Sequence, residues 1–205
     1  MEQKYKTVAG FAQAEIVEKK SRFIGTCAPV SNLDDIAAVL NKTRAQFEGA
    51  GHHAYAYFID HFTTRYNDDG EPQKTAGLPI LNVIQGNGLV KTLVIVTRYF
   101  GGILLGTGGL VKSYGLAAKL AVEASGIVER VPRRKFSALF DYNMGLRIAK
   151  HEKNQNLYTI TDTVYSDIIE YIIYVDLERE NEFMLKMADE SHGRAIIEPL
   201  GVEFF

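Results

Sequence analysis

The residues best suited to binding an anion lie in the segment RYFGGILLGTGGLVKSY, residues 98–114. Here five glycines separate an apolar strand pattern from a lysine-bearing helix pattern. The first N–H groups of a helix lack an intrahelical acceptor, and the helix dipole favours negative charge beside them. The segment therefore predicts a phosphate-binding site. A second interpretation stays open, because glycines also allow two backbones to pack closely.

A helix N-terminus alone is too weak for such a site. It contributes about 0.3–1 kcal/mol toward an exposed anion, whereas millimolar affinity requires about 4 kcal/mol. Cations must therefore contribute, and phosphate contacts made by cations weaken as salt rises. The predicted anion or nucleic-acid site comprises Arg98, Gly101, Gly102, Gly106, Thr107, Gly108, Gly109, Lys112, Lys74 and Tyr99, with Thr107 expected to cap the helix.

Aromatic side chains beside the glycines indicate which polyanion this site would bind. Tyr99 and Phe100 precede the glycines directly. Exposed rings stack with bases of single-stranded or loop RNA, at about 1–3 kcal/mol for each base. Most aromatic residues of the chain are expected to serve packing, with one or two exposed for stacking.

Nucleotide-binding motifs are incomplete in this segment. GTGGLVKS, at residues 106–113, differs at one position from a P-loop, because Val111 replaces the second required glycine. The same residue occupies the position of the third glycine in a dinucleotide-binding fingerprint. The sequence therefore argues against nucleotide hydrolysis and dinucleotide binding.

A second group of polar residues offers an alternative chemistry. The group consists of His52, His53, Asp68, Asp69 and Glu71, and it would suit a metal-dependent hydrolase of a phosphorylated or peptide substrate. However, adjacent histidines on a strand point to opposite faces, and Asp-Gly followed by Pro is typical of a turn. No nucleophile has an evident base partner. We therefore predict no catalytic residue, no metal and no cofactor.

Composition is that of a globular protein. The chain has 205 residues, of which 46% are hydrophobic, and it contains one cysteine. No run approaches the roughly 18 apolar residues of a membrane span, so a cytoplasmic location is expected. Residues 1–132 hold 14 Lys and Arg against 12 Asp and Glu, a balance of +2, whereas residues 133–205 hold 9 against 13, a balance of −4. A nucleic-acid surface is expected on the first half.

The positions of turns and hydrophobic periods predict an α+β protein with two domains, residues 1–131 and 135–205, divided near Pro132. In the first domain, strands flank Lys19 and Lys20, and a buried strand precedes the glycines. The helix after the glycines has a buried stripe and a charged stripe. The second domain has the order strand, helix, strand, strand, helix, strand, which is ferredoxin-like.

Four segments carry a family resemblance: KKSRFI at residues 19–24, DDGEP at 68–72, TAGLPIL at 75–81 and RYFGGILLGTGGLVKSYG at 98–115. Together they resemble the YigZ/Impact family, in particular its bacterial members. The resemblance implies an N-terminal Impact domain with a fold like the second domain of ribosomal protein five of the small subunit. It also implies a C-terminal ferredoxin-like domain similar to one in elongation factor G.

The resemblance further implies a role linked to translation, at RNA or the ribosome. Eukaryotic Impact proteins restrain an initiation-factor kinase through an additional N-terminal domain, so that role is not transferred, and the family supplies no catalytic residues. We therefore expect a non-enzymatic RNA-binding or ribosome-binding factor, whose acidic C-terminal domain docks a protein partner or orients the factor. A protein-interaction module without anion binding is a further alternative.

Overall fold

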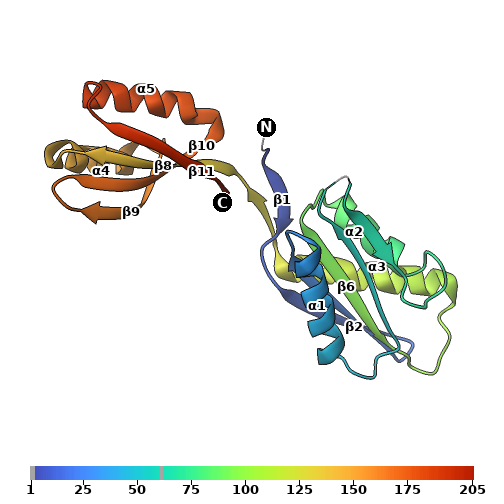
Figure 1. Ribbon diagram of the computed structural model, residues 1–205. Coiled ribbons are helices and arrows are strands. Elements are labelled where there is room, and N and C mark those ends of the chain that lie inside the picture. Colours follow the sequence, from blue (N-terminus) through green and yellow to red (C-terminus); the bar gives the residue numbers. More distant parts are fainter. Residues whose placement is uncertain (1–2, 61) are drawn as a thin grey trace. The chain divides into compact units, whose positions relative to one another are not determined.

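The computed structural model describes residues 3–60 and 62–205. It divides into two compact units, one of residues 5–129 and one of residues 130–205, with which residues 3 and 4 are grouped (Figure 1). Both units combine helices with antiparallel sheets, which confirms the predicted α+β class with two domains. Residues 132–134, which lie between the two predicted domain ranges, belong to the first strand of the second unit.

The N-terminal unit is built on a five-stranded sheet in the order β2-β3-β6-β4-β5, in which every neighbouring pair is antiparallel. A separate two-stranded sheet joins β1 to β7. The elements of this part of the chain are β1 (Tyr5–Val8), β2 (Ala12–Glu18), β3 (Ser21–Pro29), α1 (Leu33–Gln46), β4 (His52–Phe58), β5 (Thr64–Asn67), α2 (Gly77–Gly86), β6 (Thr92–Tyr99), α3 (Gly106–Ser125) and β7 (Ile127–Arg130).

The two faces of this sheet carry different helices. Leu93 and Ile95 of β6 belong to a core under α1, whereas Val94 and Val96 belong to the core under α2 and α3. The central strand is therefore buried on both sides, as its continuous apolar run predicted. Side chains alternate between the faces of a strand, so Arg98 of β6 points toward α2 and α3.

Helix α3 packs tightly across β2 and β3. Tyr114, Ala117 and Ala121 are fully buried in its predicted apolar stripe, and Lys112 is exposed in the charged stripe. A Cβ atom on Gly25 of β3 would lie 2.3 Å from the carbonyl oxygen of Ala117. This close approach fixes the position of α3 on the sheet, and with it the position of the helix N-terminus.

The C-terminal unit has a four-stranded antiparallel sheet in the order β11-β8-β10-β9. That order, with one helix after its first strand and one after its third, is ferredoxin-like and confirms the predicted topology. Phe136, Ala138 and Phe140 point into its core, beneath α4 and α5. The elements are β8 (Pro132–Phe140), α4 (Tyr142–Gln155), β9 (Thr159–Tyr165), β10 (Ile169–Asp176), a 3-10 turn (Leu177–Arg179), α5 (Glu180–Ser191) and β11 (Ile196–Phe204).

Candidate nucleic-acid interface

The glycine-rich segment connects the end of β6 to the start of α3. We call residues 100–105, which lie between them, the glycine loop. The residue before the helix is Leu105, and no side chain caps the helix start. The prediction that Thr107 caps the helix is wrong, because Thr107 is already its second residue. Gly106, Thr107 and Gly108 are exposed residues, and the N–H groups of the first helical turn lack intrahelical acceptors.

Different structural features explain why glycine occupies several positions of this segment. A Cβ atom on Gly101 would lie 2.0 Å from the carbonyl carbon of Lys20, so this glycine permits close packing. Gly102 and Gly106 have φ angles of +79° and +74°, which side chains disfavour. Gly108 has neither reason: it is helical, and a Cβ atom there would meet nothing within 4 Å. A helical glycine costs about 1 kcal/mol relative to alanine, and no packing contact in the described residues offsets that cost at Gly108.

Apolar and cationic side chains surround the bare helix start. Phe100 is 57% exposed and Leu104 is 84% exposed. Gly109 is half-buried, and a Cβ atom there would lie 3.0 Å from the Leu105 Cβ atom. Lys112 is exposed nearly two turns into α3. We call the exposed part of this segment the glycine-loop surface, and it comprises Phe100, Gly102, Ile103, Leu104, Gly106, Thr107, Gly108, Val111 and Lys112.

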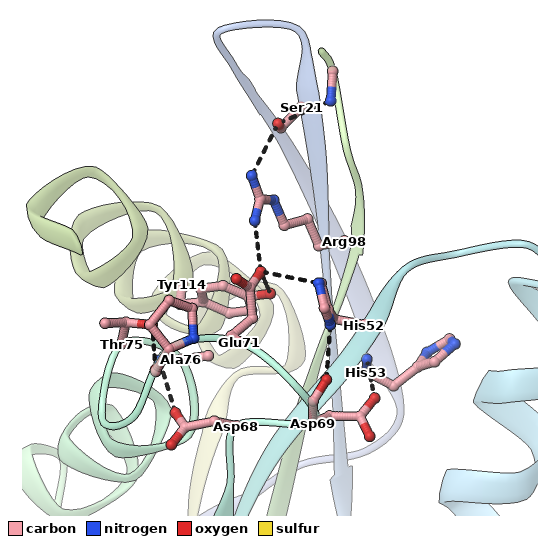
Figure 2. A network of polar contacts seen from close by, with 12 residues as sticks. Ser21, His52, His53, Asp68, Asp69, Glu71, Thr75, Ala76, Arg98 and Tyr114 are labelled. Carbon is pink, nitrogen blue, oxygen red and sulfur yellow. Dashed lines mark hydrogen bonds and ion pairs between the residues drawn. The ribbon is translucent and has the colours of Figure 1, made fainter. Parts of the chain in front are cut away.

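Arg98 is not part of this exposed surface, which corrects its interpretation as a cation available to phosphate. Only 6% of the residue is exposed. One guanidinium nitrogen donates to Glu71 Oε1 at 2.7 Å, and another donates to Ser21 Oγ at 3.4 Å. Figure 2 shows the guanidinium between these two partners. The charge of Arg98 is therefore matched inside the protein.

The buried pair of Arg98 and Glu71 also contacts aromatic side chains. The Tyr114 hydroxyl donates to Glu71 Oε1 at 2.7 Å, and burial together with this carboxylate raises the pKa of Tyr114. The Arg98 guanidinium lies 5.4 Å from the Phe23 ring centre and 5.3 Å from that of Phe100. Its Nε has no hydrogen-bond partner in the part of the chain that the structure describes. Arg98 therefore supports the exposed Phe100 ring by a cation–π contact.

Two further predicted residues belong to other parts of the N-terminal unit than the glycine-loop surface. Tyr99 alternates with Arg98 and belongs to the α1 side, where its hydroxyl donates to the backbone oxygen of Glu48 at 3.2 Å. Lys74 lies in the loop before α2, and its backbone N–H donates to Asp68. Among the predicted aromatic residues, Phe100 rather than Tyr99 is therefore the ring available for stacking.

The two histidines point to opposite faces of the sheet, as expected (Figure 2). His52 Nδ1 lies 2.7 Å from the backbone oxygen of Asp69, and its Nε2 lies 3.9 Å from Glu71 Oε1. His53 faces the other way, where its Nδ1 lies 3.0 Å from Thr97 Oγ1. Burial lowers the pKa of His53 below its ordinary value. The histidines therefore do not share a site.

The carboxylates of the same group have structural partners. Asp68 Oδ1 accepts from the N–H groups of Ala76 and Gly77 at 3.0 Å and 2.8 Å, so it caps α2 from eight residues upstream of Ala76. Asp69 Oδ2 accepts from the N–H of His53 at 2.7 Å. Because the Arg98 guanidinium lies against Glu71, a divalent cation at that carboxylate would meet a fixed positive charge.

A metal site is accordingly not favoured by this group. Across residues 3–60 and 62–205, no cluster of three or more His, Cys, Asp or Glu suits a metal ion. The spacing of DDGEP instead reflects a turn whose side chains hold the start of α2 and balance Arg98. The residues of the hydrolase alternative thus have structural contacts in this unit.

One part of the site was missed by sequence reasoning. Ser21, which is fully buried, accepts from the Gly101 N–H at 3.1 Å and from Arg98. It joins the turn between β2 and β3 to the glycine loop. The available signal was the segment KKSR, whose lysines separate two strand patterns.

Comparisons with known proteins agree over nearly the whole chain. Residues 19–122 match the description Impact N-terminal domain, and residues 149–194 match Domain of unknown function (DUF1949). The chain is 36% identical to the IMPACT family member YvyE of Bacillus subtilis, covering 94% of this chain and 89% of that protein. It is 32% identical to the IMPACT family member YigZ of Escherichia coli, covering 89% of this chain and 92% of that protein.

A solved structure has a similar fold. It is described as a hypothetical protein, is 28% identical, and aligns over 98% of this chain and 99% of its own with a TM-score of 0.64. None of the helices in the described residues is long and apolar enough to cross a membrane.

Proposed function

The chain belongs to the Impact family, as its sequence segments predicted, and on that basis we propose that it binds single-stranded RNA, including exposed ribosomal RNA. The contact is made by the glycine-loop surface of the N-terminal unit. The protein acts in the cytoplasm as a non-enzymatic factor linked to translation. Family membership supports this context, and the geometry of the glycine-loop surface supports the ligand class.

The open start of α3 is the observation that carries this proposal. Its exposed first-turn N–H groups suit phosphate oxygens, and Gly108 leaves space for a sugar-phosphate backbone to approach them. Glycines in the G-x-x-G spacing of the KH loop serve this purpose in RNA recognition. Here Gly106 and Gly109 have the same spacing at the helix start.

Charge and stacking supply the additional affinity. Lys112 is exposed near the helix start, and the sequence has no Asp or Glu between Arg98 and Glu123. Phe100, held by Arg98, offers a ring for base stacking. Gly106 lies six positions after Phe100, so their Cα atoms are at most about 20–22 Å apart. A short single-stranded segment therefore reaches both.

Two pairs of variants test this surface. Lys112→Gln removes the charge near the helix start, and Lys119→Gln removes a lysine two turns further along the same helix. Phe100→Ala removes the stacking ring. Phe11→Ala is its matched control, because Phe11 is 51% exposed and lies 5.3 Å from a lysine, Lys42 of α1.

We expect Phe100→Ala to weaken binding of a labelled single-stranded RNA by about 1–3 kcal/mol. Lys112→Gln should lower the slope of log Kd against log salt by about 0.7. Fluorescence anisotropy and co-sedimentation with ribosomes across a salt series provide the measurements. If the parent protein binds neither RNA nor ribosomes near 0.15 M salt, the proposal is wrong and the glycines serve packing. Equal losses in the control variants would place the contact elsewhere.

The C-terminal unit is proposed to contact a protein partner. Its Leu185 is 74% exposed, Tyr165 is 64% exposed and Leu146 is 59% exposed. Exposed apolar residues support protein association, and the negative balance of this half disfavours RNA. This assignment gives each unit its own class of partner.

A further inference from the structure

The turn between β2 and β3 has an unusual composition. Glu18 pairs with Ser21, so Lys19 and Lys20 form a two-residue hairpin turn. Their φ angles are +45° and +65°. Turns with positive φ at both central residues favour Asn-Gly, because other side chains are strained there. Both lysines are exposed, so neither a buried contact nor turn geometry explains why lysine occupies these positions.

The hairpin turn is fixed against the start of the glycine loop. The Gly101 N–H donates to Ser21 Oγ at 3.1 Å, and a Cβ atom on Gly101 would meet the Lys20 carbonyl carbon at 2.0 Å. Ser21 is fully buried and also accepts from Arg98. The two lysines therefore project from a backbone that is anchored next to the residues leading to α3.

The charges around this turn leave it positive. Glu18 is the adjacent acidic residue on β2. Glu15 is already paired with Arg22, whose Nε lies 2.7 Å from its carboxylate. The glycine loop and α3 contribute no carboxylate before Glu123. Within residues 18–21, two ammonium groups stand against the one carboxylate of Glu18, a local excess of positive charge that suits a chain of phosphates.

We propose that Lys19 and Lys20 bind the sugar-phosphate backbone of the same RNA segment that crosses the glycine-loop surface. This inference rests on the proposed function and extends its footprint to a second element. Lysine suits the task, because its compact ammonium on a flexible stem reaches phosphates without a fixed geometry. RNA is favoured over a protein partner, because the glycine loop beside this turn exposes the Phe100 ring and leads to the uncapped start of α3.

The double variant Lys19→Asn/Lys20→Gly separates charge from structure. It removes both ammonium groups and installs the dipeptide that this turn prefers, so the midpoint of unfolding should stay equal or rise. Affinity for a labelled single-stranded RNA of about 12 nucleotides should fall about 10-fold in low salt. The slope of log Kd against log salt should fall by up to about 1.4, the value for two phosphate contacts on a single strand.

The control is Lys42→Gln/Lys119→Gln, which removes two lysines located on α1 and further along α3. It should leave affinity within about two-fold. If the parent binds RNA through Phe100 and Lys112 but the hairpin variant binds equally well, this inference is overturned and the proposed function stands. An equal loss in the control variant also overturns it. If the parent binds no RNA, both proposals fail together.

Discussion

The buried ion pair between Arg98 and Glu71 constrains which residues can be tested for binding. Removing two charges from water costs several kcal/mol for each ion, and close contact with further hydrogen bonds offsets that cost. Here the contact is 2.7 Å, and Tyr114 and Ser21 add hydrogen bonds. Removing one partner leaves the other charge buried, which costs about 3–5 kcal/mol. Loss of RNA binding in an Arg98 variant would therefore report unfolding, whereas Lys112 and Phe100 avoid this difficulty.

His53 makes the stability of the N-terminal unit depend on pH. Burial lowers its pKa in the folded protein below the ordinary 6.5, and the charge of Asp69 opposes this effect. The unfolded chain therefore binds the proton more readily. Stability should be fully present well above pH 6.5 and should decrease as pH falls through that value toward the folded pKa.

Urea unfolding at about pH 7.5 and 5.5 checks this expectation. The parent should lose more stability than His53→Gln, in which the amide still reaches Thr97. Glu15, Glu182 and Glu203 also have shifted pKa values, but theirs are lowered from 4.5, so their effect falls below this pH window. An identical change in both proteins would show that His53 does not set the pH dependence.

At the scale of elements, the junction between β6 and α3 predicts opposite effects for two glycines. Gly101→Ala should destabilise the protein by about 1–3 kcal/mol, because the new Cβ atom collides with backbone of the β2–β3 turn. Gly108→Ala should stabilise it by up to about 1 kcal/mol, since the space is open. The same Gly108 variant should bind RNA more weakly. Chemical denaturation and anisotropy measure both properties; unchanged RNA affinity in Gly108→Ala would contradict a close backbone approach.

These elements also show what local sequence patterns predict. The buried stripe of α3 and the strand and helix order of the C-terminal unit follow from periodicity within short windows, so they were predicted correctly. The partner of Arg98 lies 27 residues away, and Ser21 lies 80 residues from Gly101. Such contacts depend on strand pairing, which periodicity does not specify. The cap of α3 was wrong because Ser and Thr preferences were applied where glycine begins the helix.

At the scale of the whole molecule, the two units have separate cores. The clusters under α1, and under α2 and α3, contain residues only up to Val122, whereas the C-terminal cluster starts at Phe136. The balance of charge also differs, at +2 for residues 1–132 and −4 for residues 133–205. Separate cores imply separate cooperative unfolding, and separate charge implies separate partners.

Full-length protein should therefore unfold in two transitions that respond to different substitutions. Arg98→Met should lower only the transition of the N-terminal unit, because it leaves Glu71 buried without its guanidinium. Phe183→Ala should lower only the free energy of unfolding of the C-terminal unit, by about 3–5 kcal/mol, since Phe183 is fully buried against Phe136 and Tyr158. In calorimetry, added RNA should raise the melting temperature of the N-terminal unit alone, because a ligand stabilises the unit that it binds. A single transition displaced by both variants would mean that the units fold as one, and RNA protection of the second transition would move the binding surface to the C-terminal unit.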